Sequence, residues 1–416
     1  MIKHILQIIW NERKQNMGIW LEFFLVSVFL WFIVDFLYVT VGIYTKPMGF
    51  DTEHTYIMRL GILNENSPEF KKEESVQKEV EQLLIIQERI QHNPLVEVAS
   101  LSFHSSPHIG NNISHHLYRD TFQTNFPVLE RAVTPDFFKV FRYKAKSGST
   151  DELVQAVEKN EFVISGSVER LLFSNGESAV GKEISLRKGD SITYRVGAVS
   201  KGVRYDHFNT WDLYFARALS NKTLETFTGD KINALEICVR VKPEEERDFI
   251  DRFRSEMTEQ LRVGNYYLST IESIPENRKI FQRDDMNNLR TRMFITFFLL
   301  VNIFLGIIGT FWFRTQHRKG EIGLRIALGD TPKKILEKYY IEGVILLTSA
   351  IIPATVIIYV LKVTGLLSYY ESFTWGRCLI GFGITYLLLA LMIIIGIWFP
   401  ARKAVKVPPM EALRDE

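Results

Sequence analysis

The run Gly176-Glu177-Ser178-Ala179-Val180-Gly181-Lys182 comes closest in this sequence to a nucleotide-binding motif. It matches most of the phosphate loop G-x-x-x-x-G-K-[ST], in which backbone amides cradle phosphates and a final hydroxyl holds magnesium. The next residue is Glu183, which has no such hydroxyl. The run also follows a predicted short helix and leads into a predicted strand, whereas a phosphate loop joins a strand to a helix. We therefore interpret it as a glycine turn.

Four histidines lie close together, and histidine is a common metal ligand. His104 and His108 would approach one ion if their segment were helical, but Pro107 and Gly110 disfavour a helix there. We favour a solvated loop over a metal site for this stretch, which also contains His115 and His116. We recognise no arrangement of serine, cysteine or carboxylate residues suited to catalysis. The chain is therefore predicted not to be an enzyme and to hold no cofactor or metal.

One carboxylate, Asp35, lies inside a long apolar run. An ionisable group at such a position costs about 2.5–3.5 kcal/mol on membrane-insertion scales, so it should face protein or water. Two interpretations stay open. Asp35 could line a path between subunits, or it could form a hydrogen bond with a neighbouring span or with headgroup water.

A basic segment in the last third of the chain holds a short amphipathic helical pattern that ends at a glycine, a natural helix stop. Thr331-Pro332 then predicts the start of a second helix, with threonine as cap and proline first. The short helix could enter a groove on a soluble partner or anchor the loop at the membrane surface, and periodicity alone favours the anchor. Its residues are Glu321, Ile322, Gly323, Leu324, Arg325, Ile326, Ala327, Leu328 and Gly329.

Four long apolar runs must position these residues. Each has about the 20 residues that a helix needs to cross a bilayer. The first is too long for a cleaved signal peptide, and Tyr44-Thr45-Lys46-Pro47 offers no small-residue cleavage site, so we predict an uncleaved anchor. The predicted transmembrane helices are 19–44, 293–313, 341–361 and 378–399.

Basic residues flank these runs on one side only. They gather before the first run, between the second and third, and after the fourth, and such clusters stay in the cytoplasm. Four crossings therefore put both termini inside the cell. The cytoplasmic parts are predicted to be an amphipathic N-terminal segment at 1–18, a loop at 314–340 and a tail at 400–416. The external parts are a domain at 45–276, a stalk helix at 277–292 and a short loop at 362–377.

The region between the first two runs alternates short strands with amphipathic helices, which is typical of α+β domains. One helix is predicted to start at Ser67-Pro68 and end before Pro94, and another to run from Pro243 to about Leu261. The predicted fold is thus an α-helical membrane protein with four transmembrane helices and an α+β extracytoplasmic domain inserted between helices 1 and 2. Two cysteines disfavour a disulfide scaffold, and a net charge of +2 gives no reason to expect a nucleic-acid partner.

Several of these motifs resemble those of one family. The run Glu321 to Gly329 resembles E-I-G-(I/L)-R-x-A-(L/I)-G-A, the cytoplasmic signature of MacB/FtsX-like ABC transporter permeases. The ending Pro400 to Arg414 is similar to P-A-x-x-A…P-x-E-A-L-R. Val133 to Val140 and the turn from Gly176 to Lys182 resemble two further family patterns in the external domain. The sequence departs from the family pattern at His317, Gly320 and Asp330.

The resemblance implies a permease subunit in the inner membrane of a bacterium. Two permeases, identical or different, would pair, and each would engage a cytoplasmic ABC ATPase that holds ATP and magnesium. The helix from Glu321 to Leu328 would be the coupling helix, and ATP-driven motion would be transmitted mechanically to export peptides, lipoproteins or amphiphilic compounds. The alternatives are an FtsX-like regulator of an external partner such as a cell-wall hydrolase, and a receptor without an ATPase. A periplasmic adaptor and an outer-membrane channel would fit a two-membrane cell, but no residue requires them.

Overall fold

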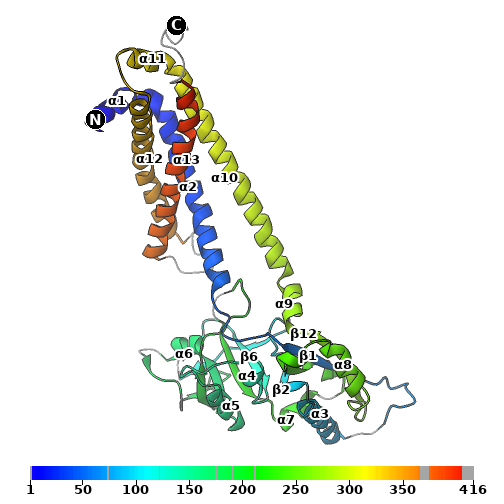
Figure 1. Cartoon of the computed structure of the whole chain (residues 1–416). Coiled ribbons are helices and arrows are strands. Elements are labelled where there is room, and N and C mark those ends of the chain that lie inside the picture. Colours follow the sequence, from blue (N-terminus) through cyan, green and yellow to red (C-terminus); the bar gives the residue numbers. More distant parts are fainter. Residues whose placement is uncertain are drawn as a thin grey trace. The chain divides into compact units, whose positions relative to one another are not determined.

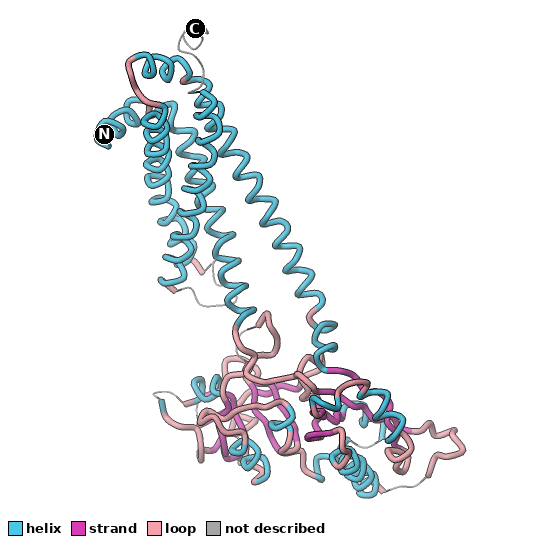
Figure 2. Tube along the Cα trace, viewed as in Figure 1, coloured by secondary structure: helices cyan, strands magenta, loops and turns pink. Residues whose placement is uncertain are grey.

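The computed structural model describes the chain except residues 1, 73–74, 121, 174–175, 190, 210–211, 228, 366–373 and 405–416. It divides into two compact units. The helical unit is Met1–Tyr44 with Met286–Glu416, and the α/β unit is Thr45–Asp285 (Figures 1 and 2). Most of the predicted tail at 400–416 and half of the predicted loop at 362–377 lie outside the described residues.

Among its described residues, the helical unit contains four helices that are long and apolar enough to cross a membrane, so the predicted fold class is confirmed. The candidate spans are Asn16–Thr45, Arg283–His317, Pro332–Leu361 and Trp375–Trp398. They belong to α2 (Arg13–Thr45), α10 (Arg283–His317), α12 (Pro332–Val363) and α13 (Trp375–Ala404), and two shorter helices are α1 (Ile2–Asn11) and α11 (Lys319–Ala327). The predicted N-terminal segment at 1–18 thus contains α1 and the first turn of α2.

Small residues let these helices approach closely, as is common between helices in membranes. A side chain at Gly343 of α12 would place its Cβ 2.8 Å from Ile393 of α13, so a larger residue cannot fit without a shift. A Cβ at Gly381 of α13 would lie 2.7 Å from the Trp31 ring on α2. Around these contacts the unit buries a core of aliphatic and aromatic side chains from α2, α10, α11, α12 and α13.

The α/β unit is built on one mixed sheet with strand order β12-β1-β11-β2-β6-β10-β7-β9-β8, and β3 pairs with β6. Its neighbours are antiparallel except for β6–β10 and β7–β9, which are parallel. The strands are β1 (Thr55–Ile62), β2 (Val96–Phe103), β3 (Ile113–His115), β6 (Val128–Val133), β7 (Phe162–Ser165), β8 (Glu183–Ile184), β9 (Tyr194–Ser200), β10 (Tyr214–Ala218), β11 (Leu235–Val241) and β12 (Tyr266–Ser273). A separate hairpin pairs β4 (Tyr118–Arg119) with β5 (Phe122–Gln123).

Short helices cover this sheet and bury the apolar faces that the sequence pattern predicts. Leu83 and Ile86 of α3 join a core with β2 and β11, and Phe137 and Phe138 of α4 join a second core. The helices are α3 (Val76–Gln91), α4 (Phe137–Val140), α5 (Asp151–Glu158), α6 (Gly166–Leu172), α7 (Asn221–Leu224), α8 (Phe249–Met257) and α9 (Ile274–Phe281).

Two predicted helix starts in this unit are wrong. The helix expected from Ser67 begins at Val76, where the Ser75 side chain accepts a hydrogen bond from the Lys78 amide at 3.3 Å. Ser67 instead closes a turn, because its amide donates to the carbonyl of Asn64 at 2.8 Å. Near the other end of the unit, Pro243 opens only a short 3-10 turn. The helix expected there starts at Phe249, after Asp248 takes a left-handed conformation with φ 54°.

The predicted stalk at 277–292 is divided between two helices. Strand β12 leads directly into α9, which spans Ile274–Phe281, and α10 starts at Arg283. Gln282 separates them with φ −90° and ψ 7°, outside the helical range, and its side-chain nitrogen Nε2 lies 3.3 Å from Nδ1 of His207. Residues 277–292 contain no proline or glycine that would mark a break, which explains why the sequence did not reveal it.

Candidate functional site

Helix α11 links α10 to α12 at one end of the helical unit (Figure 1). It ends as the sequence predicts. Gly329 has φ 95°, its amide donates to Ile326, and the Asp330 amide donates to Arg325, each at 3.0 Å. These bonds satisfy the last carbonyls of the helix. Thr331 then caps α12, because its hydroxyl accepts a long hydrogen bond of 3.5 Å from the Lys334 amide.

One face of α11 is anchored and the other is free. Ile322 is 1% exposed and packs in the core with Ile335 and Tyr339 of α12. On the other face, Leu324 is 51% and Leu328 is 80% exposed. Of the remaining predicted site residues, Gly323 is buried, Glu321, Arg325 and Ile326 are half-buried, and Ala327 and Gly329 are exposed.

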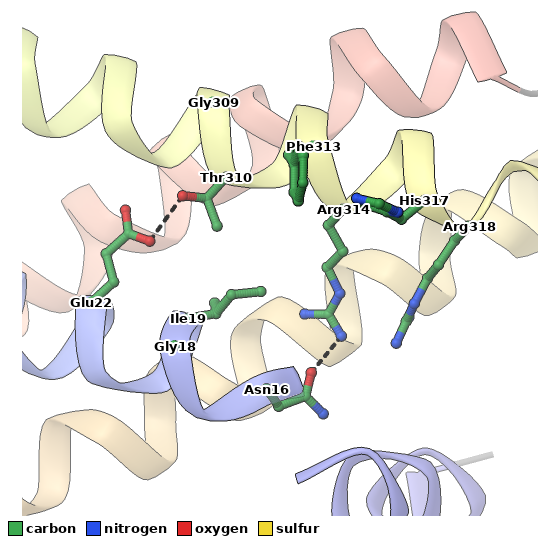
Figure 3. A pocket seen from close by; sticks show the side chains of 10 residues that line it. All are labelled: Asn16, Gly18, Ile19, Glu22, Gly309, Thr310, Phe313, Arg314, His317 and Arg318. Carbon is green, nitrogen blue, oxygen red and sulfur yellow. Dashed lines mark hydrogen bonds between the residues drawn. The ribbon is translucent and has the colours of Figure 1, made fainter. Parts of the chain in front are cut away.

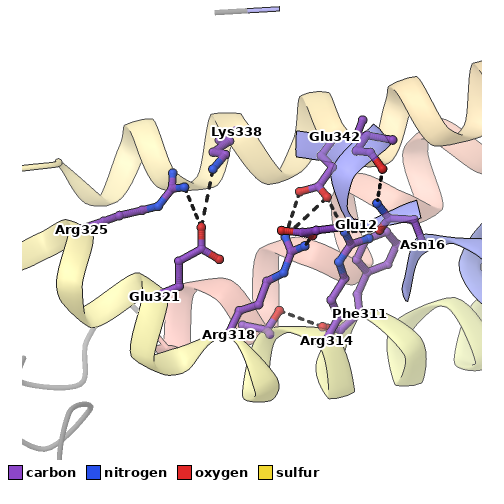
Figure 4. Close-up of polar contacts among 11 residues, drawn as sticks. Glu12, Asn16, Phe311, Arg314, Arg318, Glu321, Arg325, Lys338 and Glu342 are labelled. Carbon is purple, nitrogen blue, oxygen red and sulfur yellow. Dashed lines mark hydrogen bonds and ion pairs between the residues drawn. The ribbon is translucent and has the colours of Figure 1, made fainter. Parts of the chain in front are cut away.

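Ion pairs hold the anchored side of α11. Arg325 donates to Glu321 one turn earlier at 2.6 Å, and Lys338 of α12 lies 3.7 Å from the same carboxylate (Figure 4). The Lys338 side chain is 15% exposed. The short helix is therefore fastened to α12 by charge as well as by Ile322.

A buried charge network lies beside α11, and the sequence analysis did not identify it. The Glu342 side chain on α12 is 2% exposed and pairs with Arg314 at the end of α10 and, at 3.1 Å, with Arg318 just after it (Figure 4). Arg318 also pairs with Glu12, which lies between α1 and α2. Arg314 donates to Asn16 at 2.7 Å. One buried carboxylate and two arginines thus join α2, α10 and α12.

An open cavity of about 840 Å³ lies between α2 and α10 next to this network (Figure 3). Glu22 accepts a hydrogen bond from the Thr310 hydroxyl at 2.9 Å on its wall. The arginines on its other side already pair with carboxylates, so the cavity presents little uncompensated positive charge. It is lined by Asn16, Gly18, Ile19, Glu22, Gly309, Thr310, Phe313, Arg314, His317 and Arg318.

Asp35 forms a two-pronged ion pair within the helical unit. Arg377 in the first turn of α13 donates through Nε at 2.6 Å and through Nη2 at 2.5 Å to the two carboxylate oxygens. Both side chains are at most 10% exposed. One of the two interpretations of Asp35 expected a hydrogen bond with a neighbouring span, and this contact is of that kind. Arg377, which the sequence placed in an external loop, belongs to the helix.

The phosphate-loop look-alike is a glycine turn, as predicted. It follows α6 and leads into β8, and both Gly176 and Gly181 have left-handed φ values of 75° and 84°. Lys182 pairs with Glu177 at 3.0 Å, and Arg119 pairs with the same carboxylate at 2.9 Å. The lysine is therefore held by a carboxylate within its own loop.

The histidine-rich stretch is not a solvated loop throughout, which corrects that prediction. His108 is 5% exposed, and burial lowers its pKa to about 4. His115 pairs with Glu130 at 2.7 Å, and Nδ1 of His116 lies 2.9 Å from the Thr124 carbonyl. In the part of the chain that the structure describes, no group of three or more His, Cys, Asp or Glu side chains could hold a metal ion.

Among the described residues, four helices long and apolar enough to cross a membrane, with an α/β unit inserted after the first, define the architecture of a multi-pass membrane protein. Residues 50–254 match the family model of the MacB-like periplasmic core domain, and residues 293–409 match that of the FtsX-like permease C-terminal domain. The chain belongs to the MacB/FtsX-like ABC transporter permease family.

Curated relatives are distant. The "Macrolide export ATP-binding/permease protein MacB" of Salmonella typhi is 24% identical over 298 residues, and so is that of Salmonella typhimurium. The match covers 68% of this chain but only 43% of either relative, so the chain spans less than half of their length.

Two solved structures of external domains are also similar to this chain. The periplasmic region of MacB from Actinobacillus actinomycetemcomitans has 14% identity and a TM-score of 0.33, covering 59% of this chain and 98% of that one. The extracellular domain of the noncanonic ABC-type transporter YknZ from Gram-positive bacteria has 12% identity and a TM-score of 0.31, covering 51% and 100%.

Proposed function

We propose that this chain is a permease subunit that receives motion from a cytoplasmic ABC ATPase on α11 and transmits it to the α/β unit outside the cell. The observation that carries the proposal is the two-sided character of α11. Its inner face is fixed by Ile322 and Glu321, while Leu324 and Leu328 remain exposed. A short helix with an exposed apolar face suits a groove on a soluble partner.

The contacts around α11 suit a lever. Glu342 ties α12 to the end of α10, so α10 and α12 would move together when α11 is pushed. Helix α10 is 35 residues long without a break. At 1.5 Å per residue it is a rod of roughly 50 Å that leads from α11 towards α9 and β12. The work done outside would be the export of peptides, lipoproteins or amphiphilic compounds.

The orientation of the proposal follows from charge. Basic residues flank the helical unit at the α11 end, which supports a cytoplasmic position for this end and for both termini. We place ATP and magnesium on the partner ATPase and no cofactor in this chain, because the phosphate-loop look-alike lacks the hydroxyl for magnesium. A second permease copy, and an adaptor with an outer-membrane channel, would complete such an assembly.

The test introduces a charge on the exposed face of α11. Leu324→Asp in the permease–ATPase complex should leave the fold intact and reduce permease-dependent ATP hydrolysis at least tenfold, because a groove that takes an apolar side chain rejects a carboxylate. Val180→Asp is the matched control, since Val180 is 50% exposed in the α/β unit. Normal coupling in Leu324→Asp would overturn the proposal. Gly323, being buried, is unsuited to the test.

A second measurement separates an exporter from an FtsX-like regulator of an external partner. Candidate peptides, lipoproteins and amphiphiles are added to the reconstituted complex. An exporter should hydrolyse ATP faster when its substrate is present, since substrate is consumed in the cycle. A regulator should respond only to its external protein partner.

A further inference from the structure

A cavity of about 420 Å³ opens in the α/β unit where β1 and β11 meet the loop at 104–111 and helix α9. The strands contribute one charge of each sign, Arg59 from β1 and Glu236 from β11. Amide and apolar groups complete the wall. The other lining residues are His104, His108, Ile109, Gly110, Asn111, Asn233, Asn277, Ile280 and Phe281.

Two buried polar groups of this wall lack partners among the described residues. Glu236 is fully buried, and its Oε2 accepts hydrogen bonds from the amides of Ser105 at 3.1 Å and Ser106 at 2.9 Å. Its Oε1 has none, and neither has Nδ1 of His108, which is 5% exposed. A buried carboxylate oxygen or ring nitrogen without a partner is costly, and native proteins keep few of them. Both residues line the cavity, but the two atoms are covered, so a ligand would supply the missing hydrogen bonds after a small rotation of these side chains uncovers them.

The loop that carries the histidines is held in an unusual conformation. His104 has φ 42° and His108 has φ 62°, both in the left-handed region that non-glycine residues seldom adopt. The Ser105 and Ser106 amides that bind Glu236 lie between these two positions. The strained loop and the buried carboxylate therefore fix each other, which keeps the wall of the cavity in place without a ligand.

We propose that this cavity binds the carboxyl-terminal end of a short peptide. The last residue of a peptide presents a carboxylate and an amide N–H close together, which suits a guanidinium beside a carboxylate. Arg59 would bind the terminal carboxylate, and Glu236 would accept the N–H through its free Oε1 once that oxygen turns into the cavity. Three asparagines can pair with further peptide groups, and Ile280 and Phe281 offer an apolar surface to a side chain.

The size and position of the cavity fit this occupant. Its volume is near the lower end of the roughly 300–1,000 Å³ of ligand sites, so it takes a few residues rather than a folded domain. Asn277, Ile280 and Phe281 belong to α9, the last helix before α10. A bound peptide would therefore contact the segment that leads into the second membrane span. The inference deepens the proposed function, on which its biological meaning rests, by naming a peptide as the external ligand.

The experiment measures binding to the full-length permease in nanodiscs by calorimetry, without an ATPase. The probes are the tripeptide Ala-Ala-Phe, its C-terminal amide and its N-acetyl form. The free acid should bind saturably and the amide at least about tenfold more weakly, since a charge-assisted pair is lost. The N-acetyl form should bind like the free tripeptide. No binding, equal binding of acid and amide, or loss on acetylation would each overturn the proposal.

Variants tie the binding to the cavity. Arg59→Gln should weaken binding of the free acid about tenfold and abolish the difference in affinity between acid and amide. This is expected because the substitution and the amidation remove the same interaction. Arg247→Gln is the control, because that side chain is 94% exposed on the same unit. If Arg59→Gln fails to fold, Ile280→Asp provides the test, since Ile280 is 72% exposed at the cavity. Unchanged binding in either variant would overturn the proposal, and normal coupling of the same variant in the permease–ATPase complex would leave the proposed function standing.

Discussion

Replacing Glu342 by alanine tests whether one buried carboxylate holds the helices around α11 together. The Glu342 side chain is 2% exposed, and those of its partners Arg314 and Arg318 are 11% and 12% exposed. Removing one partner of a buried ion pair costs about 3–5 kcal/mol, because the remaining charges stay buried without compensation. Arg314 keeps its bond to Asn16 and Arg318 keeps its pair with Glu12, so we expect the lower end of this range.

The assay is the free energy of unfolding of the permease in nanodiscs or mild detergent. The matched control is Glu337→Ala, which removes an exposed glutamate from the same helix and should cost about 0–1 kcal/mol. Glu12→Ala should fall between the two, because Glu12 is 31% exposed and Arg318 would retain Glu342. If Glu342→Ala and Glu337→Ala are equally stable, the reasoning about the network is refuted.

Two further predictions concern packing and pH. Gly343→Leu should separate α12 from α13 and lower the free energy of unfolding by about 1–3 kcal/mol through overpacking. Gly309 has open space around it, so Gly309→Ala should be tolerated in the same unfolding assay. In the α/β unit, burial raises the pKa of Asp212 to about 6 and lowers that of His108 to about 4. From about pH 4 to 6, Asp212 therefore makes the fold less stable as pH rises, because the folded state keeps a proton that the unfolded state releases, and His108 has the opposite effect. Unfolding of His108→Gln and Asp212→Asn full-length variants should show opposite changes of slope relative to wild type, and a change of the same sign would contradict these assignments.

The sequence predicted the membrane-embedded fold well because its signals are strong and local. Four apolar runs of about 20 residues leave few alternatives, and Thr331-Pro332 and Gly329 mark helix ends by their own backbone preferences. Boundaries in the α/β unit were harder. Ser67-Pro68 and Ser75 are both good helix starts, and only the competing turn at Asn64 decides between them.

The polar contacts of the site could not be predicted from one sequence. Glu342 and Arg314 lie 28 residues apart on different helices, and Asp35 and Arg377 lie 342 apart. Only the packing of α2, α10, α12 and α13 brings these groups together. A signal was nevertheless present, since a glutamate inside an apolar run requires a partner. The contact of Glu236 could not be predicted either, because its strand pattern gives no indication of the loop that binds it.

If α11 is to act as a lever, the contacts on its two faces must differ in free energy. A partner that pushes on Leu324 and Leu328 must move α10 and α12 rather than detach α11 from them. The proposed outer contact would bury a few apolar side chains, worth about 1.5–3 kcal/mol each, and would be released in every cycle. The inner contact consists of the buried Ile322 and the pair of Glu321 with Lys338. Beside it, the buried Glu342 network joins α12 to α10, and the loss of one partner there costs about 3–5 kcal/mol. Under this proposal the partner would leave while the contacts of Ile322 and Glu321 with α12 and the link between α12 and α10 persist, so α11 would transmit a push without becoming the hinge.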